Sequence, residues 1–213
     1  MPYPLADRYL GDAGDFLLIN NFARHTGWLH GTMSFYAKDG VALFAVLIIA
    51  GWWLARRRSD SSQLAAVAWA ALGTLAAVAI NQPIVNAVHE ARPYTAIPDV
   101  LVLISRSTDY GFPSDHATMA GAVATGLLYV DRKLGILSWC AAVLLAFSRI
   151  YVGAHYPHDV AAGLALGAAV ILIGRVVAQP ALTAAVTTLA RTRLRPALMI
   201  AAPASEQGAR NPG

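Results

Sequence analysis

Long apolar runs that end at clusters of charge constrain this chain more than any other feature. Residues 40–55 are wholly apolar and stop at three consecutive arginines, and a longer run covers 64–85. Three more runs follow, at 117–130, 134–147 and 160–177. A helix crosses a bilayer with roughly 17–25 mainly apolar residues, so the first run needs residues 35–37 to reach that length. The pattern predicts an all-α integral membrane bundle with about five transmembrane helices.

The composition supports a membrane protein and argues against other classes. Hydrophobic residues make up 57% of the 213 residues and charged residues 13%, whereas a soluble domain is about 25% charged. The net charge is +4, but the cations gather at the edges of apolar runs, as the positive-inside rule describes. We therefore expect no nucleic-acid partner. The single cysteine, Cys140, excludes an intrachain disulfide and a CxxC motif.

The polarity of the chain divides it into three parts. Residues 1–39 form an N-terminal segment too polar to span, whose stretch 10–38 is interpreted either as a helix at the membrane interface or as a loop packed over the bundle. The predicted bundle covers 40–178, and 179–213 form a basic, cytoplasmic tail that ends in a disordered stretch. Within the fifth span, Gly163 and Gly167 have the spacing that lets helix backbones approach closely.

The distribution of cations predicts an orientation. If Arg56, Arg57 and Arg58 are cytoplasmic, alternation of the spans also places Arg132, Lys133 and the C-terminal arginines inside. The segments 86–115 and 148–159 then share the non-cytoplasmic face. We expect a multi-pass protein with its N-terminus outside and its C-terminus inside.

Three unusually polar stretches fall in those two segments: His89–Tyr94, Gly111–Ala117 and Ser148–Asp159. Ionisable groups near a membrane are costly and are functional candidates for that reason. The guanidinium groups of Arg92 and Arg149 offer planar donors that suit phosphate oxygens. A helix is predicted to start after Ser114, where unpaired backbone amides add to an anion site.

The third stretch also has the elements of a nucleophile. Asp159 lies four residues after His155, so it can accept the ring N–H of that histidine and fix the tautomer. The other ring nitrogen is then free to attack. Pro157, between them, is typical of the first turn of a helix.

The ordered pattern resembles the type 2 phosphatidic acid phosphatase (PAP2) superfamily, whose motifs are Lys-x6-Arg-Pro, Pro-Ser-Gly-His and Ser-Arg-x5-His-x3-Asp. The third motif is complete here, from Ser148-Arg149 to Asp159. The second reads Pro113-Ser114-Asp115-His116, with Asp in place of Gly, which resembles the undecaprenyl-diphosphate phosphatase branch. The first matches only in Arg92-Pro93, because Val85 occupies the position of the family lysine.

The resemblance implies a role for each matching residue. His155 is the nucleophile, Asp159 orients it, and His116 is the general acid that later activates water. Arg92, Ser114, Arg149 and the amide of Asp115 hold the phosphoryl oxygens. The resemblance further implies catalysis without metal or cofactor on a lipid phosphate in the bilayer, at the outer face of a bacterial plasma membrane. The expected substrate is a polyprenyl diphosphate.

Several alternatives stay open at this point. The substrate could instead be phosphatidate or phosphatidylglycerol phosphate, or the protein could be a non-catalytic transporter or lipid-binding scaffold. Haloperoxidases share the phosphate cradle but are soluble. His89, His116, His155 and His158 could together bind zinc, although two arginines would repel a cation. Taken singly, His89, Glu90 and His158 are interpreted as polar loop or capping groups.

Overall fold

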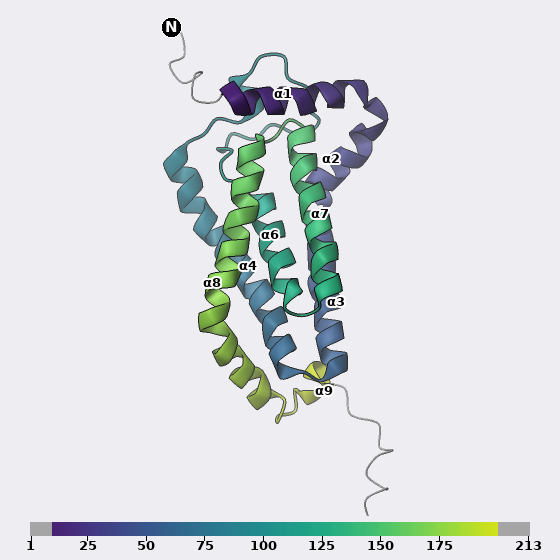
Figure 1. Ribbon diagram of the computed structural model, residues 1–213, viewed down its shortest axis with the longest axis vertical. Helices are drawn as coiled ribbons and strands as arrows, with labels where there is room; N and C mark the ends of the chain where they lie inside the picture. Colours follow the sequence, from purple (N-terminus) through teal and green to yellow (C-terminus); the bar gives the residue numbers. More distant parts are fainter. Residues whose placement is uncertain (1–9, 200–213) are drawn as a thin grey trace, which may run out of the picture.

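The computed structural model describes residues 10–199, and helices are the only regular secondary structure within that range (Figure 1). In chain order the elements are α1 (Leu10–His25), η2 (Gly27–Leu29), α2 (His30–Asp39), α3 (Val41–Arg58), α4 (Ser61–Val88), α5 (Pro93–Ala96), α6 (Asp115–Leu128), α7 (Arg132–Tyr151), α8 (Pro157–Leu189) and α9 (Arg195–Leu198). The all-α class is thereby confirmed. The predicted disordered stretch at 202–213 lies outside the described residues, as do residues 1–9.

Helices α4, α7 and α8 are long and apolar enough to cross a membrane. The segments Gly27–Asp39 and Val41–Arg58 qualify as a fourth span only if the pair counts as one, because the chain bends by 58° between them. The first apolar run therefore does not continue straight back into 35–37. Helix α6 has 14 residues, which is shorter than the roughly 17–25 residues that a helix needs to cross a bilayer. The chain is a multi-pass membrane protein, and the count of five spans stays a prediction.

Helix α6 is the centre of the bundle and packs against α8, α4 and α7. Almost every side chain from Ala117 to Leu127 is buried. Small residues allow the close packing: a Cβ added to Gly163 would lie 2.6 Å from the backbone oxygen of Ser114, and one added to Gly167 would lie 2.0 Å from that of Thr118. The close approach predicted from the two glycines is confirmed.

Replacing Gly167 with alanine is expected to destabilise the bundle, because the new methyl group would overlap the α6 backbone. Overpacking of this kind costs about 1–3 kcal/mol. Thermal unfolding of the purified protein in detergent measures the effect. Gly14→Ala is the matched control, since a Cβ there would meet nothing within 4 Å. Equal melting temperatures for the two variants would contradict the packing described here.

Helix α1 lies across one end of the bundle, where it contacts α7 and α8 (Figure 1). Phe16 is fully buried there and meets Tyr156 edge to face at 5.6 Å. The amide of Asn20 pairs with both backbone groups of Leu101, at 2.8 and 3.0 Å. The stretch 10–38 thus forms helices α1 and α2, and α1 is packed over the bundle. The predicted location of this stretch at the membrane interface stays a prediction.

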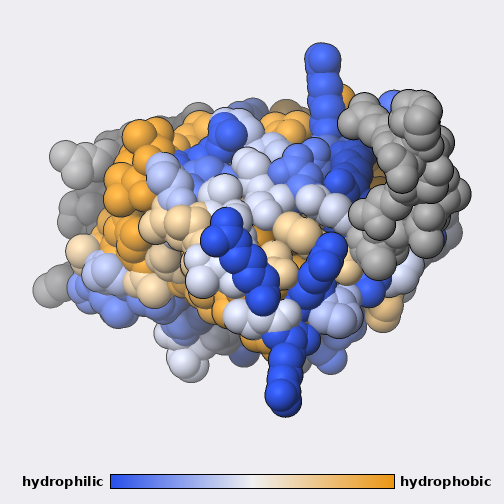
Figure 2. Space-filling view, turned by 90° about the horizontal axis from the view of Figure 1, so that it is seen from below, coloured by the Kyte–Doolittle hydropathy of each residue, from blue (hydrophilic) through white to orange (hydrophobic). Residues whose placement is uncertain are grey.

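The opposite end of the bundle collects the cationic clusters. Arg58, at the end of α3, pairs with Asp131 before α7 at 2.8 Å, and Arg56 donates to the backbone oxygen of Pro196. Asp60 and Asp131 cap the helices that start there. Figure 2 shows this end, where hydrophilic side chains project beside apolar surface. The clusters that alternation predicted on one face do share one end of the molecule.

Candidate active site

Backbone hydrogen bonds join the three polar stretches beneath α1. The amide of Gly111 donates to the oxygen of Glu90 at 2.9 Å, and the amide of Ser114 donates to that of Asp159 at 3.0 Å. The stretches come from the end of α4, the start of α6 and the α7–α8 connection, so they are distant in sequence. These bonds fix the segments that carry the predicted functional side chains against one another.

A cavity of about 220 Å³ opens between these segments. Five of the seven predicted site residues are among those that line it: Arg92, Asp115, His116, Arg149 and His155. The rest of its wall comes mainly from the loop after α5, with Tyr94, Ile104, Ser105, Ser107, Asp109, Tyr110 and Pro113. Ser114 and Asp159 are fully buried behind this wall. The structure therefore brings the predicted residues together.

The two nitrogens of His155 have different partners. Nδ1 faces Oδ2 of Asp159 at 3.2 Å. Nε2 faces the guanidinium groups of Arg92 at 3.0 Å and Arg149 at 3.5 Å. The same carboxylate oxygen accepts the Tyr156 amide at 2.9 Å, which caps α8, and Pro157 occupies the first turn as predicted. The helix start thus fixes the carboxylate that orients the ring.

The surroundings of His155 keep its imidazole neutral. The ring is fully buried in the α7–α8 connection, and burial together with the charges of Arg149 and Arg92 holds its pKa well below the usual value. With Nδ1 carrying the proton toward Asp159, Nε2 keeps a lone pair that points at the cavity. A neutral ring nitrogen of this kind is a potential nucleophile.

Two buried arginines share the cavity wall and are held in place by backbone oxygens. Arg149 donates to the oxygen of Ala37 at 3.0 Å, and Arg92 donates to that of Ala154 at 3.2 Å. Arg92 also pairs with the carboxylate of Asp109 at 3.1 Å. Two guanidinium groups aimed at one small volume repel each other, and an anion placed between them removes that cost.

Asp109 was missed by the sequence analysis. Burial alone would raise its pKa, but hydrogen bonds from Ser107 and the charge of Arg92 lower it below the usual range. The carboxylate therefore stays ionised and orients Arg92. Asp109 lies in a loop between two motifs, so the sequence offered no sign of its role. Ala37, which accepts from Arg149, could not be predicted either, because its contribution is a backbone oxygen that any residue would supply.

The side chain of Asp115, which replaces the family glycine, is hydrogen-bonded to α4 as well as lining the cavity. Oδ1 of Asp115 accepts from the amide of Asn81 at 2.6 Å and from that of Gln82 at 2.8 Å. Asn81 is fully buried and also donates to the oxygen of Pro113. The polar groups that interrupt the end of α4 thus accommodate the departure from the family motif. Val85, where the family has lysine, is buried on the same helix.

Ser114 supplies a further donor for an anion. It is the N-cap residue of α6, as predicted, and its hydroxyl caps no backbone amide. Its Oγ is buried and has no hydrogen-bond partner within the described residues. A buried unsatisfied hydroxyl costs free energy, so a ligand oxygen is a natural partner.

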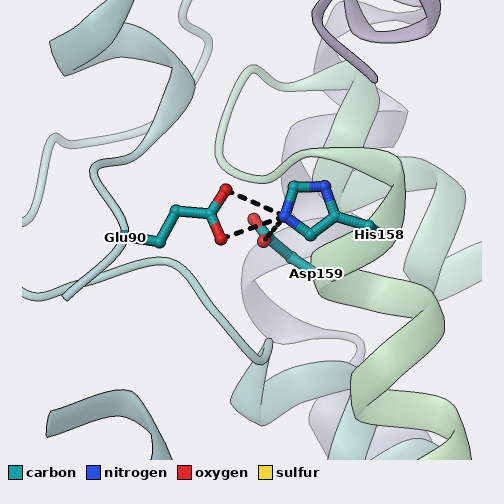
Figure 3. A group of neighbouring side chains, drawn as sticks. All are labelled: Glu90, His158 and Asp159. Carbon is teal, nitrogen blue, oxygen red and sulfur yellow. Dashed lines mark hydrogen bonds and ion pairs between the residues drawn. The ribbon is translucent and has the colours of Figure 1, made fainter. Parts of the chain in front are cut away.

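Glu90 and His158 were interpreted from the sequence as simple polar groups, but Glu90 contacts His158, and His158 contacts Asp159. His158 Nε2 lies 2.8 Å from Glu90 Oε1 and 3.2 Å from Asp159 Oδ1 (Figure 3). Over residues 10–199 these three form the single group whose donor atoms could together hold a metal ion. The four histidines considered for zinc form no such group in the same range. His89 lies over the ring of Tyr110 at 4.5 Å.

Known proteins resemble this chain over most of its length. The family model of the PAP2 superfamily matches residues 66–182. The chain belongs to the PAP2 superfamily. It is 33% identical to the undecaprenyl-diphosphatase BcrC of Bacillus subtilis over 74% of this chain and 77% of that protein. The chain is accordingly a membrane phosphatase, and the recognition made from three motifs is confirmed.

Two solved structures resemble the bundle. The crystal structure of Aquifex aeolicus LpxE has a TM-score of 0.59 and 28% identity, over 74% of this chain and 90% of that one. A PAP2-type phosphatidylglycerolphosphate phosphatase from Bacillus subtilis has a TM-score of 0.57 and 21% identity, over 88% of this chain and 90% of that one. The second likeness concerns the fold alone.

Proposed function

We propose that this protein hydrolyses a polyprenyl diphosphate of the undecaprenyl type to the monophosphate, through a phosphohistidine intermediate. One observation carries the reaction type: Nε2 of His155 faces two buried guanidinium groups across a small cavity while Nδ1 faces a buried carboxylate. We further propose that the site opens at the non-cytoplasmic face of the plasma membrane, because the cationic clusters occupy the other end of the bundle.

The first step transfers the terminal phosphoryl group. Nε2 of His155 attacks the terminal phosphorus, the bond from that phosphorus to the bridging oxygen breaks, and His116 gives its proton to the departing lipid monophosphate. Asp159 holds the Nδ1 proton and balances the positive ring. Arg92 and Arg149 neutralise the phosphoryl oxygens, with Ser114 Oγ and the amide of Asp115 as further donors.

The second step regenerates the enzyme. His116, now neutral, takes a proton from water, the resulting hydroxide attacks phosphorus, and the P–N bond breaks to release inorganic phosphate. In the free protein Arg92 Nη1 donates to Nε2 at 3.0 Å. A phosphoryl oxygen that accepts from this guanidinium in its place exposes the lone pair, so substrate binding itself readies the nucleophile.

The substrate class rests on the relatives rather than on the cavity. BcrC, which this chain resembles over most of its length, is named for undecaprenyl diphosphate. Asp115 in place of the family glycine fits the same branch. Phosphatidylglycerol phosphate is the second candidate, because the superfamily motifs in this sequence are also compatible with that lipid.

Phosphate release from a panel of lipids tests this proposal. We expect purified protein in detergent to release phosphate from undecaprenyl diphosphate at least about tenfold faster, in kcat/KM, than from phosphatidylglycerol phosphate or phosphatidate, a difference of about 1.4 kcal/mol in transition-state binding. Vanadate should compete with substrate, and EDTA should leave the rate unchanged. A preference for either glycerolipid would reassign the substrate, and inactivity on every lipid would overturn the reaction.

A further inference from the structure

We propose that Glu90 and His158 are positioning residues that keep the carboxylate of Asp159 ionised and aimed at His155. This inference rests on the proposed function, because it concerns the orientation of the proposed nucleophile. Neither side chain lines the cavity, so both would act through Asp159 rather than on the substrate.

The contacts form a continuous series from Glu90 to His155. Glu90 Oε1 and Oε2 lie 2.8 and 3.0 Å from His158 Nε2, and the same nitrogen lies 3.2 Å from Asp159 Oδ1 (Figure 3). The other oxygen of Asp159 faces His155 Nδ1 at 3.2 Å. Each oxygen of the Asp159 carboxylate therefore faces one histidine.

Packing holds the series in place. The His158 ring stacks on Tyr156 at an interplanar angle of 10° and lies 5.5 Å from the ring of Phe112. The side chain of Glu90 is 7% exposed and that of Asp159 is 0% exposed. Glu90 is anchored by its backbone oxygen, which accepts the amide of Gly111. The series thus links the loop before α5 to the first turn of α8.

A tautomer argument gives Glu90 its role. Ionised Glu90 can only accept, so His158 must carry its proton on Nε2, where it also faces Oδ1 of Asp159. The nitrogen of this N–H dipole lies 3.2 Å from Oδ1 without a hydrogen bond to it, and at that distance the positive end of the dipole favours the ionised form of the Asp159 carboxylate. If Glu90 gains a proton, its O–H can donate to Nε2, the proton of His158 moves to Nδ1, and the Asp159 carboxylate loses the favourable N–H dipole beside it. Asp159 would then be a poorer acceptor for His155.

This exchange falls in the range where the enzyme would work. Burial, and next the charge of Asp159, raise the pKa of Glu90 to about 7. The charged and titratable groups that face Asp159 are Arg92 and Glu90 from the loop between α4 and α5, His155 from the α7–α8 connection, and His158 from α8. Among these, Glu90 is the group whose protonation we expect to change the tautomer of His158.

Glu90→Gln tests the proposal, because glutamine lacks the ionised, acceptor-only carboxylate that keeps the His158 proton on Nε2, and its amide N–H can donate to that nitrogen at every pH. We expect kcat for undecaprenyl diphosphate to fall about tenfold at pH 8, the loss of one charge-assisted hydrogen bond, with KM unchanged. The gap between wild type and variant should close as the pH falls to about 6, since protonated Glu90 in the wild type has the same effect. The ratio of the two rates cancels any titration of His116 that both proteins share.

His158→Gln removes the other partner of the Glu90–His158 contact. It is the alternative test variant if Glu90→Gln fails to fold. The double variant should be no slower than the slower single one, because both substitutions interrupt one series. His25→Gln, on the exposed surface of α1, is the matched control and should leave the pH profile unchanged.

Two outcomes would overturn the inference. If wild type releases phosphate but the rate ratio of either variant is the same at pH 6 and pH 8, the pair does not act through protonation of Glu90. If the wild-type protein binds Zn²⁺ by calorimetry, depends on it for activity, and loses both on Glu90→Gln, the cluster is a metal site. Inactivity of the wild type on every lipid would instead contradict the proposed function.

Discussion

Replacing His155 with alanine is expected to abolish phosphate release, with a loss in kcat of at least about 10³-fold. No other described imidazole has one nitrogen on a buried carboxylate and the other on two guanidinium groups. Phosphate release from undecaprenyl diphosphate measures the loss. Acid quenching with a terminally labelled substrate should also trap label on the wild-type protein and none on the variant.

The control for this variant separates catalysis from folding. His25→Ala removes an exposed imidazole on α1 and should keep full activity. Both variants should elute from a sizing column as the wild type does. Substantial phosphate release by folded His155→Ala would show that another group is the nucleophile, and His116 would then be the first candidate.

Replacing Arg149 with lysine is expected to lower kcat about 10²–10³-fold, although the formal charge is kept. The guanidinium reaches the oxygen of Ala37 with Nη1 while Nη2 faces His155. A lysine ammonium is a single point and cannot serve both directions. Removing one donor for the developing charge of a transition state costs this much in other enzymes. Steady-state kinetics on the preferred lipid measures the effect.

Arg57→Lys is the matched control, since Arg57 is exposed at the opposite end of the bundle, over the ring of Trp53. Its rate should equal that of the wild type. If Arg149→Lys raised KM and left kcat intact, the arginine would bind ground state and transition state equally, and the charge-stabilising role proposed for it would be wrong.

The bundle was largely predictable because apolar runs and helix caps are local signals. Pro157 and Ser114 mark the starts of α8 and α6, and Gly163 marks a close helix contact. The bend before α3 was not predictable, since the apolar run at 40–55 gives no sign that Gly40 changes the direction of the chain. That bend places Ala37 where it can accept from Arg149.

The site was predictable where its chemistry lies within one motif or at one helix start. The pairing of His155 with Asp159 follows from a separation of four residues at the start of α8. The residues that support this pair come from distant segments of the chain, so no spacing in the sequence predicts them. Asp109 and Glu90 act through contacts made across loops, and each resembles an ordinary polar loop residue until the fold is known.

By itself the sequence determined an all-helical membrane chain of the PAP2 superfamily and the residues that carry its motifs. Hydropathy and short-range spacing encode these properties, because membrane insertion and helix capping depend on neighbours in the chain. Only the tertiary structure decided that Glu90 meets His158, that Asp115 turns toward Asn81, and that two arginines face one imidazole. Such contacts depend on how separate helices pack, and packing joins residues whose separation in the sequence is arbitrary.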